Sequence, residues 1–124
     1  MDKSTCEERV LLGIKRFLVN NHGFKMIEEQ SNGFGKIDFV CQDTDDGSIH
    51  FIIPTMTDNG SDEFDTDSID IDDDFRKYCE SVMIKFFKSH NDWNDCSVSF
   101  DICNVLVIGD DRAIVKFHSK CYPA

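Results

Sequence analysis

The sequence lacks any continuous apolar run approaching the roughly 20 residues that a transmembrane helix needs. Its first ten residues, MDKSTCEERV, also lack the apolar segment of a secretory signal. These two absences predict a cytoplasmic protein that makes no membrane contact. Hydrophobic residues make up 40% of the 124 positions and include 11 Phe, so the chain can form the core of one domain spanning residues 1–124.

Common metal-binding and nucleophile motifs are lacking as well. No C-x-x-C pair and no compact Cys/His cluster occurs, so no zinc site is expected. The histidines are dispersed and none lies in a recognisable Ser or Cys nucleophile motif, so no hydrolase triad is expected; they are His22, His50, His90 and His118. With no secretion signal, we expect the cysteines to be mostly buried, reduced thiols; they are Cys6, Cys41, Cys79, Cys96, Cys103 and Cys121.

Basic residues are absent from residues 58–74, DNGSDEFDTDSIDIDDD, which hold nine of the 24 Asp and Glu residues. The net charge of the chain is −11, and without these nine acids 15 acidic residues face 13 basic ones, or −2. Such a segment repels a phosphate backbone and the rest offers no basic stripe, so nucleic acid is a disfavoured partner. Low hydrophobicity and high charge predict a mobile loop at about 57–71.

The periodicity of the apolar residues predicts the element order α-β-β-β-α-β-β. A helix is expected over Thr5–Asn21, ended by Gly23, and a second follows Asp72, which can cap it. Pro54 indicates that regular pairing of the third strand stops there or that the strand lies at a sheet edge. The expected strands are Phe24–Glu29, Lys36–Gln42, Ser48–Ile53, Val98–Ile108 and Ala113–His118.

Four short sequence motifs occur along these elements: GKIDFV at 35–40, FIIPT at 51–55, SFDIC at 99–103 and HSKCY at 118–122. In this order they resemble the YraN-like endonuclease family, a branch of the PD-(D/E)xK superfamily. The resemblance implies an α/β (α+β) protein with the restriction-endonuclease-like αβββαβ core, a mixed central sheet flanked by helices. It also implies Mg²⁺ or Mn²⁺ as the cofactor of an active member.

Matched position by position, the resemblance places Asp38 at the metal-binding Asp of that family. Ile53 then occupies the position of the metal-binding Glu, and Thr55 occupies that of the catalytic Lys. Hard cations need several clustered oxygen ligands, which Ile53 cannot supply. Lys36 is expected to share a strand face with Asp38, as an ion-pair partner or as a relocated lysine.

Three functions follow as hypotheses. The leading one is a catalytically inactive endonuclease-like domain, a pseudoenzyme retained as a binding or interaction module. The first alternative is a divergent metal-dependent nuclease in which Asp38, Lys36 and a relocated Asp43 or Asp58 rebuild the site. The second is binding of a protein partner, or mimicry of nucleic acid, by the acidic loop. Asp101 lies in an apolar run, so it is expected to be buried and hydrogen-bonded.

Overall fold

The computed structural model describes residues 3–58, 72–90, 96–108 and 112–123. The elements in these ranges follow the predicted order α-β-β-β-α-β-β, with a π-helical turn added after the first helix. They are α1 (Lys3–Arg16), η1 (Phe17–Asn21), β1 (Phe24–Glu29), β2 (Phe39–Asp43), β3 (Ile49–Asp58), α2 (Asp73–Ser89), β4 (Val98–Ile108) and β5 (Arg112–Pro123). The α/β (α+β) class, with a mixed sheet flanked by helices, is thereby confirmed.

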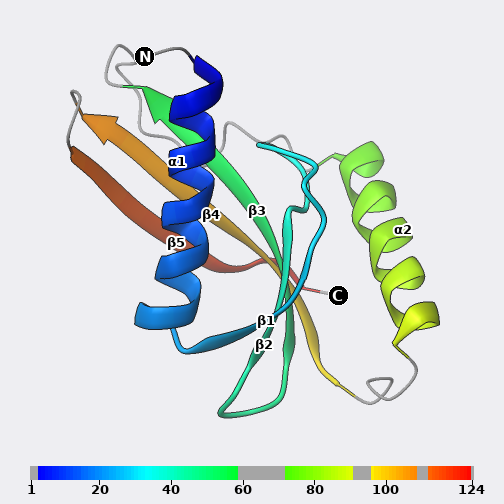
Figure 1. Ribbon diagram of the computed structural model, residues 1–124. Helices are drawn as coiled ribbons and strands as arrows, with labels where there is room; N and C mark the ends of the chain where they lie inside the picture. Colours follow the sequence, from blue (N-terminus) through cyan, green and yellow to red (C-terminus); the bar gives the residue numbers. More distant parts are fainter. Residues whose placement is uncertain (1–2, 59–71, 91–95, 109–111, 124) are drawn as a thin grey trace.

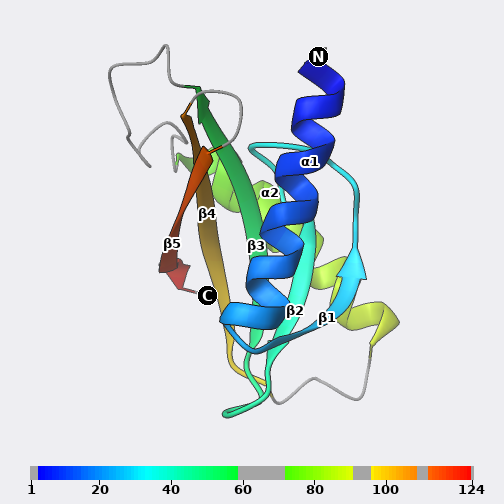
Figure 2. The same ribbon diagram turned by 60° about the vertical axis from the view of Figure 1, so that its left-hand side comes forward.

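The five strands form one sheet in the spatial order β1-β2-β3-β4-β5. β3 and β4 pair in parallel, and every other neighbouring pair is antiparallel. Parallel neighbours need a long crossover, and α2 lies in the connection between β3 and β4. α1 covers one face of the sheet and α2 covers the other (Figures 1 and 2), which gives three layers.

Each face of the sheet carries its own hydrophobic cluster. The cluster under α2 contains Ile37, Val40, Ile49, Phe51, Ile53, Cys79, Phe86, Phe100 and Ile102. The cluster under α1 contains Ile14, Leu18, Phe24, Phe39, Cys41, Ile52, Cys103 and Val105. Successive strand residues point to opposite faces, so Ile52 and Ile53 enter different clusters although they are neighbours in the chain.

Aromatic packing joins the two parallel strands to α2. Phe51 of β3 stacks on its register neighbour Phe100 of β4, with ring centroids 5.1 Å apart. Phe86 of α2 meets Phe51 edge-on, with centroids 5.6 Å apart and planes at 85°. Burying one such side chain stabilises the fold by about 1.5–3 kcal/mol, so this trio is a main source of attachment for α2.

The ends of the helices follow local sequence signals. Asp72 caps α2 as predicted, because its carboxylate accepts the N–H of Phe75 at 2.8 Å. The first helix reaches Asn21 as predicted, but its last five residues widen into the π-helix η1, where His22 N–H bonds to the carbonyl of Phe17 at 3.0 Å. Gly23 follows with a φ of 76°, a conformation that suits glycine.

The second strand begins later than the sequence suggests. It was expected to start at Lys36, but β2 starts at Phe39. The reason is that side chains take the hydrogen bonds of the preceding loop. Ile37 N–H donates to the hydroxyl of Tyr78 on α2 at 2.9 Å, and Gly33 N–H donates to the carboxylate of Asp38 at 2.9 Å.

The third strand does not end at about Ile53 as expected, and regular pairing stops near Pro54 on the β2 side only. β3 runs on to Asp58 and pairs with β4 throughout. The β2–β3 ladder stops at Ile52, so Pro54 lies beyond it. The Pro54 carbonyl accepts Gly35 N–H at 2.8 Å on that side, and the proline nitrogen points the same way, so no ladder bond is lost.

Two further boundaries differ from expectation. β5 extends to Pro123 rather than ending at His118, with a register shift opposite Phe100 and Ile102 of β4. The start of the predicted acidic loop, 57–58, belongs to β3, and its remainder, 59–71, lies outside the described residues.

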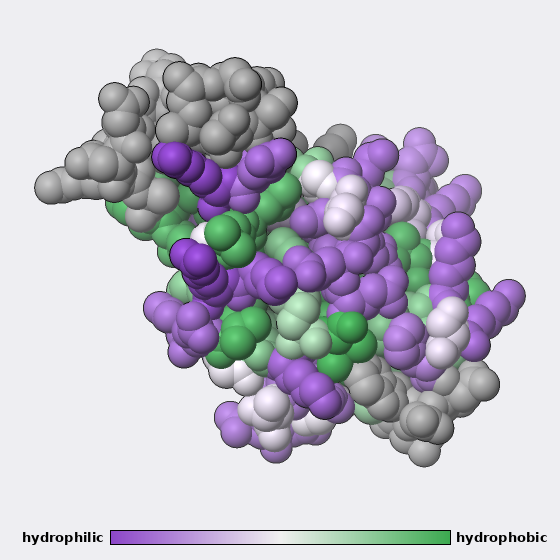
Figure 3. Space-filling view, in the orientation of Figure 1, coloured by the Kyte–Doolittle hydropathy of each residue, from purple (hydrophilic) through white to green (hydrophobic). Residues whose placement is uncertain are grey.

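The surface seen in Figure 3 is largely hydrophilic, with hydrophobic residues in small separate areas. Within the described ranges, neither helix has the length and apolar character needed to cross a bilayer. The edge strand β1 carries a register shift between Met26 and Glu28.

We expect Asp72→Ala to lower the free energy of unfolding by about 1 kcal/mol, because the Phe75 N–H loses its acceptor. Asp72→Asn is the matched control: its amide oxygen can still cap the helix, so stability should stay close to that of the unmodified chain. Urea denaturation measures both. Equal losses in the two variants would contradict a capping role.

Candidate functional site

Asp38 lies in the loop directly before β2 and is buried, with 3% of its surface exposed. Its Oδ1 accepts the N–H of Gly33 at 2.9 Å. Its backbone is fixed on both sides, because Gln30 N–H donates to the Asp38 carbonyl at 2.8 Å and Asp38 N–H donates to the Ile52 carbonyl at 3.0 Å. The carboxylate thus closes the loop that contains it.

A groove of about 550 Å³ lies beside Asp38, between α1 and the β1–β2 loop. Three carboxylates line it, those of Glu8, Glu29 and Asp38, together with Lys15. Lys15 forms a salt bridge to Glu29, with Nζ 3.0 Å from Oε2. Within the part of the chain that the structure describes, no three His, Cys, Asp or Glu side chains lie close enough to hold a metal ion together.

Lys36 does not accompany Asp38 into this groove. It is exposed and lines a second pocket, beside Tyr78 and Lys85 of α2. The expected shared strand face is wrong, because both residues precede the first residue of β2 and strand alternation does not apply to them. Lys36 and Asp38 therefore line two different pockets, which lie next to different helices.

The two positions that the resemblance assigns to the metal-binding Glu and the catalytic Lys are both buried. Ile53 is fully buried in the cluster under α2, whereas Asp38 lines the groove beside α1. Thr55 is 6% exposed, and its hydroxyl accepts the amide N–H of Asn104 at 2.6 Å. Neither side chain brings an oxygen ligand or a charge to Asp38.

Asp43 and Asp58 were the two acids expected as relocated ligands beside Asp38. Asp43 is the last residue of β2, so about 16 Å of strand separates it from Asp38. Its carboxylate accepts the N–H of Asp45 at 2.8 Å and so shapes the next turn. Asp58 ends β3, and its side chain lies outside the described residues.

The structure brings together a buried polar network that the sequence did not reveal. His50 of β3 places Nδ1 against the Asp101 carboxylate of β4 in a very short contact, and Ser99 Oγ lies 2.8 Å from the same nitrogen. The other ring nitrogen, Nε2, lies 2.8 Å from Ser48 Oγ. Asp101 is fully buried, as predicted, and His50 is 6% exposed.

Two serine hydroxyls extend this network. Ser48 donates its hydroxyl proton to Asp46 at 2.6 Å, and Ser99 donates its own to Asp101 Oδ1 at 3.1 Å. Each serine hydroxyl also lies within hydrogen-bond distance of a His50 ring nitrogen, so the ring, the two hydroxyls and the Asp101 carboxylate form one network. The Phe24 ring stacks on the His50 ring, with centroids 4.7 Å apart.

The contacts link Ser48, His50 and Asp101 in the order of a hydrolase triad. The hydrogen bond that Ser48 donates nevertheless opposes that chemistry. A nucleophilic serine must give its proton to the histidine. Here the Ser48 hydroxyl donates to the Asp46 carboxylate at 2.6 Å instead. The network is a structural clamp between β3 and β4.

Four cysteines have free thiols in the described part of the chain: Cys41, Cys79, Cys96 and Cys103. Burial raises the pKa of Cys103 to about 12. Burial also raises the pKa of Cys41 to about 12, and the negative charge of Asp101 contributes to this shift. Thiols that stay protonated at neutral pH are poor nucleophiles, so these two are core residues, as expected.

No family model, curated protein or solved structure matches the chain.

We expect His50→Ala to lower the free energy of unfolding by about 2–3 kcal/mol, because it removes a hydrogen-bond partner of the fully buried Asp101 carboxylate. Urea denaturation gives this value. As a control, His22→Ala removes an exposed histidine with ring contacts only and should cost at most about 1.5 kcal/mol. Similar costs for the two variants would contradict the clamp.

A second prediction concerns alkaline stability. Burial raises the pKa of the Cys103 thiol from 9.0 in the unfolded chain to about 12 in the folded protein. The contribution of this thiol to stability is therefore complete below pH 9.0 and is lost as the pH rises toward 12. The destabilisation caused by Cys103→Ala should therefore shrink by about 1 kcal/mol between pH 8 and pH 10.

The control for this measurement is Ile52→Val, a substitution without a titrating group in the same cluster. Its cost should be equal at both pH values. A Cys103→Ala cost that is also independent of pH would show that the thiol titrates alike in the folded and unfolded chain.

Proposed function

We propose that this chain is an endonuclease-like domain of the cytoplasm that does not cleave nucleic acid and acts as a binding or interaction module. The observation that carries the proposal is that Asp38, at the retained metal-ligand position, forms a hydrogen bond within its own loop. Its Oδ1 accepts the Gly33 N–H, and the side chain is 3% exposed. A carboxylate that closes a loop has a structural reason to persist without catalysis.

The residues at the other two catalytic positions support the same proposal. Magnesium is bound by several clustered oxygens because they replace its tightly held water. Ile53 has no oxygen in its side chain and faces the cluster under α2. Thr55 offers only a hydroxyl, which is already bonded to Asn104, and it has no charge to stabilise a reacting phosphate.

A divergent Mg²⁺- or Mn²⁺-dependent nuclease is the alternative, and one observation favours it. Glu8 and Glu29 line the same groove as Asp38, so relocated carboxylates are available there. Glu29 is engaged with Lys15 at 3.0 Å, which would have to be released before it could bind a cation.

The test is incubation of the purified chain with Mg²⁺ or Mn²⁺ and single-stranded, double-stranded or branched DNA. We expect no cleavage above the level of an Asp38→Asn preparation, and no saturable Mn²⁺ binding by calorimetry. Cleavage by the unmodified chain that Asp38→Asn abolishes would establish the nuclease instead.

Stability separates a structural from a catalytic Asp38 independently of activity. Asp38→Asn keeps an oxygen that can accept the Gly33 N–H, whereas Asp38→Ala removes it. We expect Asp38→Ala to lower the free energy of unfolding by about 1–3 kcal/mol and Asp38→Asn to lower it much less. Two unchanged stabilities would contradict the loop-closing role.

A further inference from the structure

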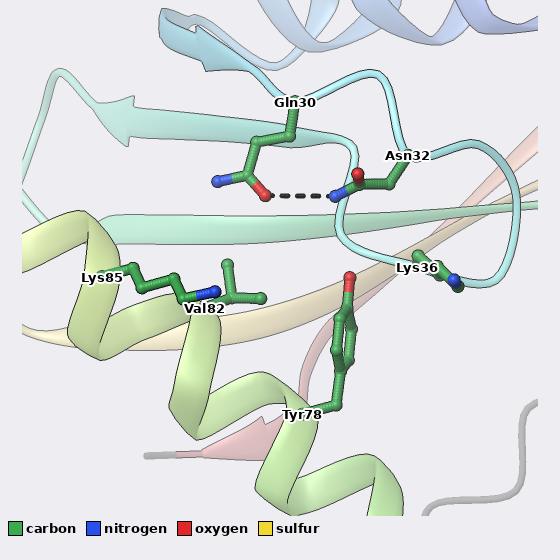
Figure 4. A pocket seen from close by; sticks show the side chains of 6 residues that line it. All are labelled: Gln30, Asn32, Lys36, Tyr78, Val82 and Lys85. Carbon is green, nitrogen blue, oxygen red and sulfur yellow. Dashed lines mark hydrogen bonds between the residues drawn. The ribbon is translucent and has the colours of Figure 1, made fainter.

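A second pocket, of about 280 Å³, lies between the β1–β2 loop and the middle of α2. Figure 4 shows its six lining residues, Gln30, Asn32, Lys36, Tyr78, Val82 and Lys85. The loop contributes the first three and α2 the last three. This pocket lies next to α2, whereas the groove with Asp38 lies next to α1.

The charge of this pocket is opposite to that of the chain. Two lysines line it and no carboxylate does, although the net charge is −11. Within the described residues, neither Lys36 nor Lys85 forms a salt bridge, whereas Lys15 on the other side of the sheet does. Two lysines at one pocket, neither in a salt bridge among the described residues, create a local field that favours an anion.

The hydrogen-bonding groups of the pocket are held in place before any ligand arrives. Tyr78 Oη accepts the Ile37 N–H at 2.9 Å, which leaves its own proton for donation. Asn32 donates from Nδ2 to the Ile37 carbonyl at 2.8 Å and to Gln30 Oε1 at 3.3 Å. Desolvation raises the pKa of Tyr78, so its hydroxyl stays a donor at neutral pH.

We propose that this pocket binds the phosphate group of a small phosphate monoester, with Lys36, Lys85 and the Tyr78 hydroxyl as its donors. Such a group carries a charge close to −2 at neutral pH and three acceptor oxygens, which matches two ammonium groups and a hydroxyl better than a carboxylate does. Val82 and the Tyr78 ring supply apolar surface for the body of the ligand.

The size of the pocket argues for a small molecule rather than a polymer. A volume of about 280 Å³ is near the lower end of the range for ligand sites, roughly 300–1,000 Å³. A nucleic acid would also bring many phosphates toward a chain with net charge −11. A single phosphate in the pocket avoids most of that repulsion.

The experiment is a titration of ¹⁵N-labelled protein followed by NMR, with phenyl phosphate, inorganic phosphate and benzoate as probes. We expect saturable shifts of the amides of residues 30–37 and 78–85 with phenyl phosphate. Inorganic phosphate should bind more weakly because it lacks an apolar body, and benzoate should bind about tenfold more weakly because it has one charge fewer.

Lys36→Gln and Lys85→Gln should each weaken phenyl phosphate binding by about three- to tenfold. Lys88→Gln is the matched control, because it removes the same charge from an exposed residue of α2 that does not line the pocket. Its affinity should stay within about twofold of the unmodified chain.

Three results would overturn the proposal: no saturable shifts with phenyl phosphate, equal affinity for benzoate, or equal weakening by Lys88→Gln and the pocket variants. DNA cleavage plays no part in this test. The pocket proposal can therefore fail while the proposed function stands, and it can hold even if the chain proves to be a nuclease.

Discussion

The buried contact between His50 and Asp101 is the constraint on which the pairing of the two parallel strands depends. It lies between β3 and β4, the parallel pair that joins the N-terminal meander to the C-terminal hairpin. A fully buried carboxylate is costly without hydrogen-bond partners, so a slip of the two strands by one residue would separate Asp101 from His50. The pair therefore selects one register, and the stacked rings of Phe51 and Phe100 follow from that register.

The loop between β1 and β2 lines two pockets of opposite charge, one on each side of the sheet. Gly33 and Asp38 line the acidic groove beside α1, and Gln30, Asn32 and Lys36 line the basic pocket beside α2. The same loop is held by the Tyr78 hydroxyl through Ile37 N–H. Because Tyr78 also lines the basic pocket, a ligand bound there would contact the residue that anchors the loop.

The sequence predicted the elements that local patterns control. The bounds of β1 and β4 and the cap at Asp72 agree with expectation, because a short run of strand-forming residues and a capping side chain act over a few positions. The late start of β2 and the continuous β3 through Pro54 depend on hydrogen bonds from distant segments. The His50 network was missed for the same reason: 51 residues separate His50 from Asp101, and no motif links them. Only Asp101 gave a signal, as an acid within an apolar run.

The register shift in β1 has a consequence for association between chains. An open edge strand exposes backbone groups that another chain can extend by sheet addition, a common start of aggregation. The irregularity between Met26 and Glu28 interrupts that template, and Lys25 and Glu29 place exposed charges along it. An incoming strand would have to desolvate those charges and would find its hydrogen-bond partners out of step. This margin of the sheet is thus protected against edge-to-edge polymerisation by its own backbone geometry.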